Sequence, residues 1–375
     1  MNKRTICTAE SVTKGHPDKF CDAVSDAVLD ECLKVDSNAR VACEVFATKG
    51  LVVVGGEITT TAEPNYRAIV QKVAREVGYE LDGTELIVAV NEQSPDIKEA
   101  VDGECEQGAG DQGIMVGYAS DETLDFLPLE YSYARKLTDR LEKMYSIGEI
   151  KGIGSDGKSQ VSAEFDGDSF SHFTKIVVSI QHTEDKDIDE LKAEITEKVI
   201  GYVFADFDLS ETEILINPSD KFVVGGIDAD TGLTGRKIVA DAYGPRVPVG
   251  GGAFSGKDPS KVDRSGAYFA RYIARNIVEG NIAEKCQVSI GYAIGKAEPL
   301  SVNVDTFGTG KADDETIRNA VLEIFDFRPS EIIRTLDLKK SIYSLTASGG
   351  HFGKDAFPWE QADKVSELRK TIFGE

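Results

Sequence analysis

The sequence has little positive charge for its length. Its 375 residues include 42 Lys and Arg against 65 Asp and Glu, which gives a net charge of −23 at pH 7. A field of this sign repels the phosphates of nucleic acids and anionic membrane surfaces. No apolar run approaches the roughly 18 residues of a membrane span. We therefore expect neither nucleic acid nor membrane as a partner, and any anionic ligand must meet a local cationic pocket.

Cysteine and histidine patterns are sparse as well. The six cysteines form no C-x-x-C pair and the N-terminal residues carry no apolar signal segment, so a cytoplasmic protein with reduced thiols is expected. The four histidines are His16, His172, His182 and His351. Their spacing does not match a zinc site, and no G-x-S-x-G elbow is present. His172 and His182 lie in or beside a predicted strand and are expected to be structural.

The periodicity of apolar residues divides the chain into three repeats. Each repeat has the same order of elements: a helix, two strands and a second helix. Such a repeat predicts the fold class α/β (α+β), with three similar domains that are each a mostly antiparallel β-sheet covered by helices. The domain ranges are predicted as 1–100, 112–231 and 232–375, with boundaries that can interleave. The main elements are expected at 18–34, 41–47, 51–60, 64–79, 85–90, 129–145, 158–165, 173–182, 187–202, 211–217, 260–280, 286–295, 300–308 and 314–325.

Three glycine-rich segments interrupt this order, at 103–117, 225–235 and 249–256. They are too polar and too rich in glycine for core strands, so we expect loops that carry the functional site. Two matches to G-x-G-x-x-G, at 108–113 and 152–157, lack the strand and helix that a dinucleotide site needs. A dinucleotide-binding site is therefore not predicted.

The segment GGAFSGKD resembles a phosphate-binding P-loop up to its last position. Gly251, Gly256 and Lys257 have the P-loop spacing, but Asp258 replaces the Ser or Thr that would bind magnesium. Lys257, Lys261 and Arg264 form a cationic concentration in an acidic chain. A solvated basic helix face explains this concentration as well as a phosphate site does.

Two further motifs combine charge with a constrained backbone. GLTGRK places Arg236 and Lys237 beside two glycines and near Asp230, an arrangement that suits phosphate oxygens and ribose hydroxyls but also an ordinary charged turn. GHPDK sets His16 and Asp18 around a proline at a helix start. Both side chains can face one ligand, although Asp18 can equally be only a favourable charge in the first helical turn.

Together, three segments resemble the signatures of bacterial-type S-adenosylmethionine synthetases, also called methionine adenosyltransferases. They are GHPDK at 15–19, EQGAGDQG at 106–113 and GGGAFSGKDPSKVDRS at 250–265. The resemblance continues through RVACE, VGGEITT, QSPDI, KSQV, GLTGRK, HFG and FPWE in the same order. It implies formation of S-adenosylmethionine from ATP and methionine, in a fold of three pseudo-threefold-related domains.

The resemblance also implies roles for individual residues. Catalysis would fall to His16, Arg236, Lys237, Lys257 and Lys261. ATP would be bound by His16, Asp156, Lys158, Lys221, Phe222, Asp230, Arg236, Lys237, Ala253 and Lys257. Methionine would be bound by Glu57, Gln93, Asp230 and Lys261. Two Mg²⁺ ions per site would involve Asp18 and Asp263, and K⁺ would involve Glu44. Residues 93–106 would form a mobile lid, and a homodimer with shared active sites would pair into a homotetramer.

Some positions depart from the family pattern. Lys14 stands where Glu usually precedes GHPDK, Lys221 stands where Arg is common, and the segment KEAVDGEC is shorter than in some members. Two alternatives stay open. A P-loop-like ATPase or kinase would form ADP without methionine, whereas a regulatory or scaffold subunit would bind ATP without forming product.

Overall fold

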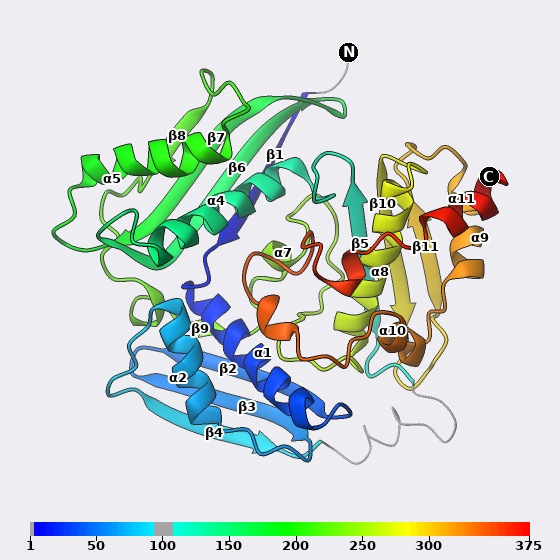
Figure 1. The fold of residues 1–375 in the computed structure, drawn as a ribbon, viewed down its shortest axis with the longest axis horizontal. Helices are drawn as coiled ribbons and strands as arrows, with labels where there is room; N and C mark the ends of the chain where they lie inside the picture. The colour runs from blue at the N-terminus through cyan, green and yellow to red at the C-terminus, as the bar shows by residue number, and fades with distance from the viewer. Residues whose placement is uncertain (1–3, 94–107) are drawn as a thin grey trace.

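The computed structural model describes residues 4–93 and 108–375. Three β-sheets surround a central region of loops and short helices (Figure 1). Six of the eight strand pairs in this part of the chain are antiparallel, which confirms the predicted fold class. The predicted lid, residues 93–106, lies outside the described residues except for Gln93.

The N-terminal sheet is covered by two helices. Helix α1 begins after the N-cap residue His16 with Pro17, whose fixed φ suits a first helical position, and it buries Phe20, Val24 and Val28. The sheet order is β4-β3-β2-β9. The elements are α1 Pro17–Val35, β2 Arg40–Thr48, β3 Leu51–Thr59, α2 Tyr66–Val77, β4 Glu85–Asn91 and β9 Gly232–Leu233.

The central sheet has the order β1-β6-β7-β8 and packs against α4, and one apolar cluster joins it to the α5 region. The predicted helix 187–202 is present, but it passes from α5 into one π-helical segment before it ends. The elements are β1 Arg4–Val12, α4 Leu129–Ser146, β6 Ile153–Asp166, β7 Ser169–His182, α5 Ile188–Ile195, the π-helix Thr196–Ile200, α6 Gly201–Val203 and β8 Glu213–Ile216.

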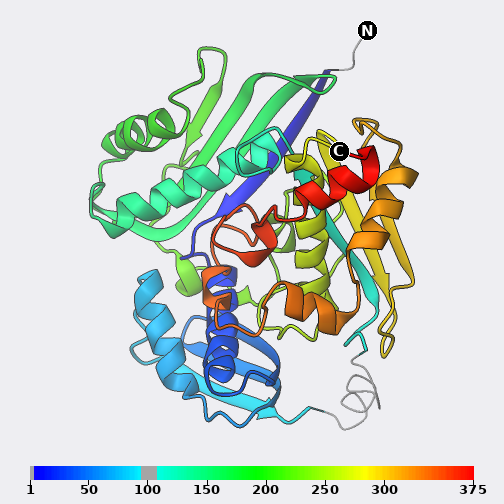
Figure 2. The same ribbon diagram turned by 45° about the vertical axis from the view of Figure 1, so that its right-hand side comes forward.

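The third sheet has the order β11-β10-β5 and lies against α8. The chain from α10 to α11 passes through the central region, near α1 and α4 (Figure 2). The elements are β5 Gly113–Ser120, α7 Ile238–Asp241, α8 Val262–Glu279, β10 Lys285–Tyr292, β11 Ser301–Asp305, α9 Asp314–Ile324, α10 Pro329–Thr335, α11 Val365–Phe373 and the 3₁₀ helices Gly226–Asp228, Tyr343–Leu345 and Pro358–Glu360.

Strand β5 corrects the last part of the predicted loop 103–117, residues 113–117. Its residues from Met115 onward are buried, and it pairs with β10 along its whole length. Gly117 faces α8 so closely that a Cβ atom would lie 2.0 Å from the backbone carbon of Ala270. The glycines of this segment therefore allow close packing of a strand on a helix, which composition alone does not distinguish from a loop.

Each sheet borrows one strand from another part of the chain. Strand β1 joins the central sheet, β5 joins the third sheet, and β9 returns to the N-terminal sheet. Each predicted domain range thus lends a strand to the next. The boundaries themselves stay a prediction, because no cut of the chain separates the three sheets.

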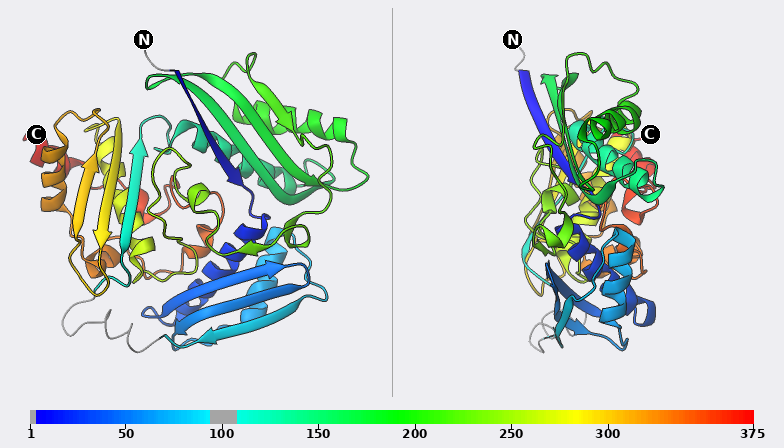
Figure 3. Two further views of the ribbon diagram at one scale, coloured as in Figure 1. Left: turned by 180° about the vertical axis from the view of Figure 1, so that it is seen from behind. Right: turned by 90° about the vertical axis from the view of Figure 1, so that its left-hand side faces the viewer.

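Within residues 4–93 and 108–375, the helices cover one side of each sheet. Viewed from behind, the strands of all three sheets lie in front of their helices (Figure 3). One apolar cluster joins the first and third sheets, and a second belongs to the central sheet. The described part of the chain contains no helix that is both long enough and apolar enough to cross a bilayer.

Candidate active site

His16 occupies the N-cap of α1 and is 2% exposed. Its Nδ1 atom accepts a hydrogen bond from the backbone amide of Asp18 at 3.1 Å. Burial, followed by the charges of Lys237 and Lys158, lowers the pKa of His16 to about 3. The imidazole is therefore neutral at physiological pH, and because Nδ1 accepts, the proton resides on Nε2. The site thus contains a fixed, uncharged hydrogen-bond donor.

Asp18 connects this helix start to the GLTGRK segment. Its Oδ1 atom accepts from the Leu233 amide at 3.0 Å, and its Oδ2 atom accepts from Lys237 Nζ at 2.5 Å. Arg236 Nε lies 3.9 Å from Oδ1. Burial alone would raise the pKa of Asp18, but the bonds from Lys237 and Leu233 hold it below its usual value. The carboxylate is ionised and gathers two cations at one point.

Strand β6 adds Asp156 and Lys158 to the same neighbourhood. Asp156 is 5% exposed, and its Oδ2 atom accepts from the Gly226 amide at 2.8 Å. Its Oδ1 atom is buried without a hydrogen-bond partner. Burial raises the pKa of Asp156, while the Gly226 amide and Lys158 oppose the rise. An unpaired buried acceptor is costly, so this oxygen is suited to a ligand donor.

The glycine-rich segment 249–256 leads into a second cationic group. Lys257 Nζ donates to Asp263 Oδ2 at 2.6 Å. Gly252 lies against the same carboxylate, since a Cβ atom there would be 2.4 Å from Asp263 Oδ1. Gly235 is also close to Ala253, since a Cβ atom at Gly235 would lie 2.6 Å from the Cβ atom of Ala253. The GLTGRK and GGAFSGKD segments are therefore neighbours.

Asp258 explains why the P-loop pattern fails at its last position. The residue is fully buried, and its Oδ2 atom accepts from the Val41 amide at 2.6 Å and from Lys261 Nζ at 2.5 Å. Burial alone would raise its pKa, but Lys261 lowers it below the usual value. Asp258 ties the loop to β2, and no helix begins directly after the Lys257 position as a P-loop requires.

Two carboxylates lie on the uncovered face of the N-terminal sheet beside the second group. Glu44 is on β2 and Glu57 is on β3. Glu44 is exposed, but desolvation by the protein around it still raises its pKa, the charge of Lys257 opposes this, and Glu57 adds to it. Gln93 follows β4, and its backbone amide donates to Thr59 Oγ1 at 3.1 Å. Acidic groups and a lysine thus share one region.

The remaining predicted residues surround the first group less tightly. Phe222 is held by His182, whose Nε2 atom accepts the Phe222 amide at 3.1 Å, so His182 is structural as expected. Lys221 is exposed and lies 3.8 Å from Glu184. Asp230 is exposed, and its charge acts on both His16 and Asp156.

The predicted residues thus form two groups along α1. The first group is anchored at Asp18. The second is anchored two turns further, where Asp26 binds the Gly256 amide at 2.8 Å. Eight residues of helix separate these anchors by about 12 Å. The structure also adds two residues that sequence reasoning missed, Asp22 and Asp26. Their four-residue spacing from Asp18 was the available signal.

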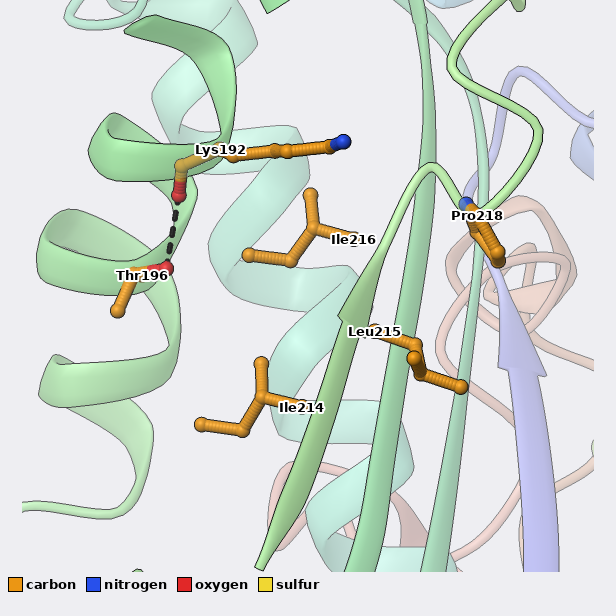
Figure 4. Close-up of a pocket in the computed structure, with 6 residues that line it drawn as sticks. All are labelled: Lys192, Thr196, Ile214, Leu215, Ile216 and Pro218. Atoms are coloured by element: carbon orange, nitrogen blue, oxygen red, sulfur yellow. Dashed lines mark hydrogen bonds between the residues drawn. The ribbon is translucent and has the colours of Figure 1, made fainter. Parts of the chain in front are cut away.

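A separate pocket of about 480 Å³ lies in the central domain, away from both groups. The side chains of Ile214 and Ile216 point toward α5, and Lys192 extends across the top of this space (Figure 4). Its lining residues are Lys192, Thr196, Ile214, Leu215, Ile216 and Pro218. It contains none of the predicted site residues.

The carboxylates of the two groups fit Mg²⁺ that enters with a polyphosphate. The described residues contain no cluster of three His, Cys, Asp or Glu side chains that could hold a metal. Mg²⁺ is usually bound by one or two carboxylates plus substrate phosphates rather than by a protein cage. Asp18 and Asp263, each paired with a lysine, provide this kind of donor set.

Three helix-covered sheets with cationic loops at their junction define an α/β protein with a site suited to an anionic ligand. Family models of S-adenosylmethionine synthetase match it throughout: the N-terminal domain at residues 4–98, the central domain at 106–222 and the C-terminal domain at 224–361. The chain belongs to the S-adenosylmethionine synthetase family.

Curated relatives extend over the full chain. The S-adenosylmethionine synthase of Mesoplasma florum is 46% identical and covers 98% of this chain and 100% of its own. That of Thermus thermophilus is 45% identical, with 99% of both chains covered. That of Treponema denticola is 46% identical, with 97% of this chain and 98% of its own covered. The similarity therefore includes all three domains.

Proposed function

We propose that this protein forms S-adenosylmethionine from ATP and L-methionine, with release of the triphosphate chain and its hydrolysis to diphosphate and phosphate. The observation that carries the proposal is the pairing of Lys237 with Asp18 and of Lys257 with Asp263, in two neighbouring loops of a strongly acidic chain. These cations are concentrated where a polyanion can replace or join the carboxylates. Membership of the synthetase family supports the same reaction.

The chemistry needs no general base. The thioether sulfur of methionine carries no proton, so its lone pair attacks C5′ of ATP directly, while the C5′–O5′ bond breaks and O5′ leaves with the triphosphate. The barrier falls when fixed donors face the charge that develops on O5′ and the phosphates. A neutral His16 with its proton on Nε2 is such a donor. The catalytic cations are Arg236, Lys237, Lys257 and Lys261.

The ATP site is assigned to residues of both groups. The unpaired Oδ1 atom of Asp156 is suited to accept a hydrogen bond from the nucleoside, and the exposed ammonium of Lys158 is suited to phosphate. The remaining assignments are Lys221, Phe222, Asp230 and Ala253 in the nucleotide site, together with His16, Arg236, Lys237 and Lys257.

Methionine is assigned to the uncovered face of the N-terminal sheet. Its ammonium group suits the carboxylate of Glu57, and its carboxylate suits Lys261. Asp230, which lies in the first group, is assigned to the same amino acid. Gln93 stands where β4 ends, next to this face. Both ends of the amino acid would be held, which aligns sulfur with C5′ and turns an encounter in solution into an internal reaction.

Metal ions would neutralise charge on the leaving triphosphate. Asp18 and Asp263 would hold two Mg²⁺ ions per site, and Glu44 would hold K⁺. Bound Mg²⁺ would supply Lewis-acid stabilisation of the leaving triphosphate. With substrate bound, Lys237 and Lys257 would turn from their carboxylates to phosphate oxygens, because both bonds are made by flexible lysine ends.

The active form is assigned as a homodimer with shared active sites, which pairs into a homotetramer. An apolar row crosses all four strands on the uncovered face of the N-terminal sheet: Leu233, Phe46, Val53 and Ile87. Leu233 and Ile87 are 36% and 42% exposed. The solvated face of such a sheet is normally polar. Glu44 and Glu57 lie on the same face, so a second copy covering the row would also close over the site.

A mass-spectrometric assay with ATP, methionine, Mg²⁺ and K⁺ tests the reaction. S-Adenosylmethionine with one diphosphate and one phosphate per turnover is expected. ADP without a sulfonium product would favour a P-loop-like ATPase, and ATP binding without turnover would favour a regulatory subunit. Sedimentation of wild type and of Phe46→Asp tests the dimer, because a buried carboxylate in the apolar row should yield monomers without product formation.

A further inference from the structure

A row of four carboxylates runs along one face of α1 at four-residue spacing, which places them above one another on the helix. All four are at most 6% exposed. Each accepts a backbone amide from a segment more than 200 residues away. The pairs are Asp18 with Leu233, Asp22 with Gly235, Asp26 with Gly256 and Asp30 with Tyr343.

We propose that Asp22 and Asp26 are positioning residues, which fix the two cationic loops of the active site in register with each other on α1. Asp22 holds the amide that precedes Arg236 and Lys237, and Asp26 holds the amide that precedes Lys257. The proposal rests on the function assigned above, since it states how the cations of that site are placed.

Asp22 fixes the first loop through Gly235. The Gly235 amide lies 2.8 Å from Asp22 Oδ1, and its φ of 76° is a conformation that favours glycine. The other oxygen of Asp22 accepts from Lys19 Nζ at 2.9 Å, and Lys19 also donates to Asp241 at 2.5 Å. Asp241 lies at the end of α7, directly after the loop. The segment 235–241 is therefore fixed to α1 at both ends.

Asp26 fixes the second loop in the same way. The Gly256 amide lies 2.8 Å from Asp26 Oδ1, with a φ of 79° at Gly256. Arg264 forms a fork on the same carboxylate, with Nη1 at 2.8 Å and Nη2 at 2.9 Å. Its Nη1 atom also donates to the backbone oxygen of Lys257 at 2.9 Å. The backbone is thus held on both sides of the Lys257 Cα atom, at the Gly256 amide and at the Lys257 carbonyl.

The two attachments share one design. In each, a buried aspartate with its own buried cation binds the amide of a left-handed glycine, and a cationic site residue follows directly in the chain. Burial raises the pKa of Asp22 to about 7, although Lys19 opposes the rise. The bond to the Gly235 amide is therefore strongest above neutral pH, because hydrogen bonds to ionised acceptors are roughly twice as strong as neutral ones. A rigid helix therefore sets the distance between the two cationic loops, which loops alone would leave variable.

Asp30 provides a control within the same row. It accepts the amides of Tyr343 and Ser344 at 2.9 and 2.8 Å and the Ser344 hydroxyl at 2.6 Å. These residues belong to a 3₁₀ helix that carries none of the assigned site residues. Tyr343 lies against the Arg264 guanidinium, and Thr346 hydrogen-bonds to Arg264 and Asp26. Loss of Asp30 should therefore reach Lys257 only through these contacts and lower kcat much less than loss of Asp26 does.

The test compares Asp22→Ala, Asp26→Ala and Asp30→Ala for kcat, for both KM values and for Tm. Displacing the catalytic cations should lower kcat by about 10²-fold in Asp22→Ala and Asp26→Ala, whereas Asp30→Ala should stay within about threefold. The KM for methionine should change little, because the displaced groups face the triphosphate. Equal losses of kcat in all three variants, or wild-type kcat in Asp22→Ala, would overturn the proposal.

The asparagine variants cover the case in which an alanine variant does not fold. Asp22→Asn and Asp26→Asn keep an acceptor oxygen but lose its charge, so their kcat should lie between wild type and alanine, about tenfold below wild type. Asp30→Asn should match wild type. If kcat falls as much in Asp30→Asn as in Asp22→Asn and Asp26→Asn, the row of carboxylates stabilises the fold without a specific role in positioning the two loops.

Amide hydrogen exchange separates this proposal from the assigned reaction. Without substrate, Gly235 should exchange faster in Asp22→Asn, and Gly256 should exchange faster in Asp26→Asn, than in wild type. A wild-type protein that makes no S-adenosylmethionine would overturn the function even with these shifts. Product formation by wild type with unchanged exchange and kcat in the variants would overturn the positioning role alone.

Discussion

Lys257 Nζ lies 2.6 Å from Asp263 Oδ2, within a loop and helix start that carry the assigned phosphate contacts. Neither partner is fully buried, since their side chains are 22% and 15% exposed. The pair is mostly buried, so a charge left without a partner there would be costly. It therefore keeps a cation in place until a phosphate oxygen can replace the carboxylate as its partner.

The first prediction is that Lys257→Ala keeps the fold but nearly abolishes S-adenosylmethionine formation. Removal of one preorganised donor to the developing charge should lower kcat by about 10² to 10³. Lys285→Ala is the matched control, because Lys285 forms a pair of the same 2.6 Å length with Asp168, away from the assigned site residues. The rate of S-adenosylmethionine formation and the Tm of both variants test this prediction. Wild-type turnover by Lys257→Ala would contradict the assigned role.

A second prediction separates the two roles of His16, helix capping and donation from Nε2. His16→Asn keeps a side-chain acceptor at the N-cap but removes the imidazole, so kcat should fall by about 10²-fold with little change in Tm. His16→Ala should lose a similar factor in kcat. Its free energy of unfolding should also fall by about 1 kcal/mol, because the helix cap is lost too. Equal Tm values for the two variants would contradict the capping role.

The wild-type rate should also show no titration of His16 near its ordinary value. Burial and two lysines lower the pKa of this residue to about 3, so the imidazole is neutral from pH 5 to 8. Unfolded chains take up this proton near pH 6.5, so the residue contributes stability above that pH, and the contribution is lost as pH falls toward 3. An imidazole pKa near 6.5, measured by NMR, would contradict this environment.

Metal removal should abolish activity without unfolding the protein. Within the described residues, Asp18 and Asp263 belong to no three-ligand cluster, so Mg²⁺ binds mainly through the substrate phosphates. EDTA should therefore leave Tm unchanged in the absence of nucleotide, and it should remove the rise in Tm that ATP with Mg²⁺ produces. A large drop in Tm of the nucleotide-free protein would indicate a structural metal instead.

Much of this architecture could be predicted from local patterns. Helix α1 has a clear helical period, and the strands on either side of Lys49 alternate as expected. Strands β1, β5 and β9 were missed because each pairs with a partner far away in the chain, such as Val12 with Lys158, and carries no local signal of that pairing. The sequence places Gly117 in a loop for the same reason. Its role depends on α8, about 150 residues later.

The site could be predicted residue by residue from motifs, but its supports could not. Asp22 and Asp26 look like ordinary acidic positions of an amphipathic helix, and only the structure shows that distant amides point at them. Asp258 looked like a defect in a P-loop. The structure shows a buried carboxylate that binds β2 and Lys261, which is a positive reason for aspartate at this position.

A further prediction concerns that position directly. Asp258→Ser completes the P-loop sequence pattern, yet it should produce no ATPase. It removes the partner of Lys261 and the acceptor for the Val41 amide, and loss of one partner from a buried pair costs about 3–5 kcal/mol. Urea unfolding and an assay for ADP measure the two effects. ADP formation by a stable variant would support the P-loop reading.

The last prediction concerns Glu142, which links α4 to the segment before His16. Its Oε1 atom accepts the Lys14 amide at 2.6 Å. Burial raises the pKa of Glu142 to about 7, although the Lys14 amide opposes the rise. The folded protein therefore binds this proton more tightly than the unfolded chain does. The stability it contributes is complete below pH 4.5 and is lost as pH rises through 7.

Glu142→Gln should therefore become relatively more stable as pH rises. The amide keeps an oxygen for Lys14 but has no charge to bury, so the unfolding free energy of the variant minus that of wild type should increase by about 1–3 kcal/mol between pH 4.5 and 8. Urea unfolding at several pH values measures the difference. A difference that stays flat, or that decreases with pH, would show that Glu142 is ionised at no cost and that the His16 segment is held by other contacts.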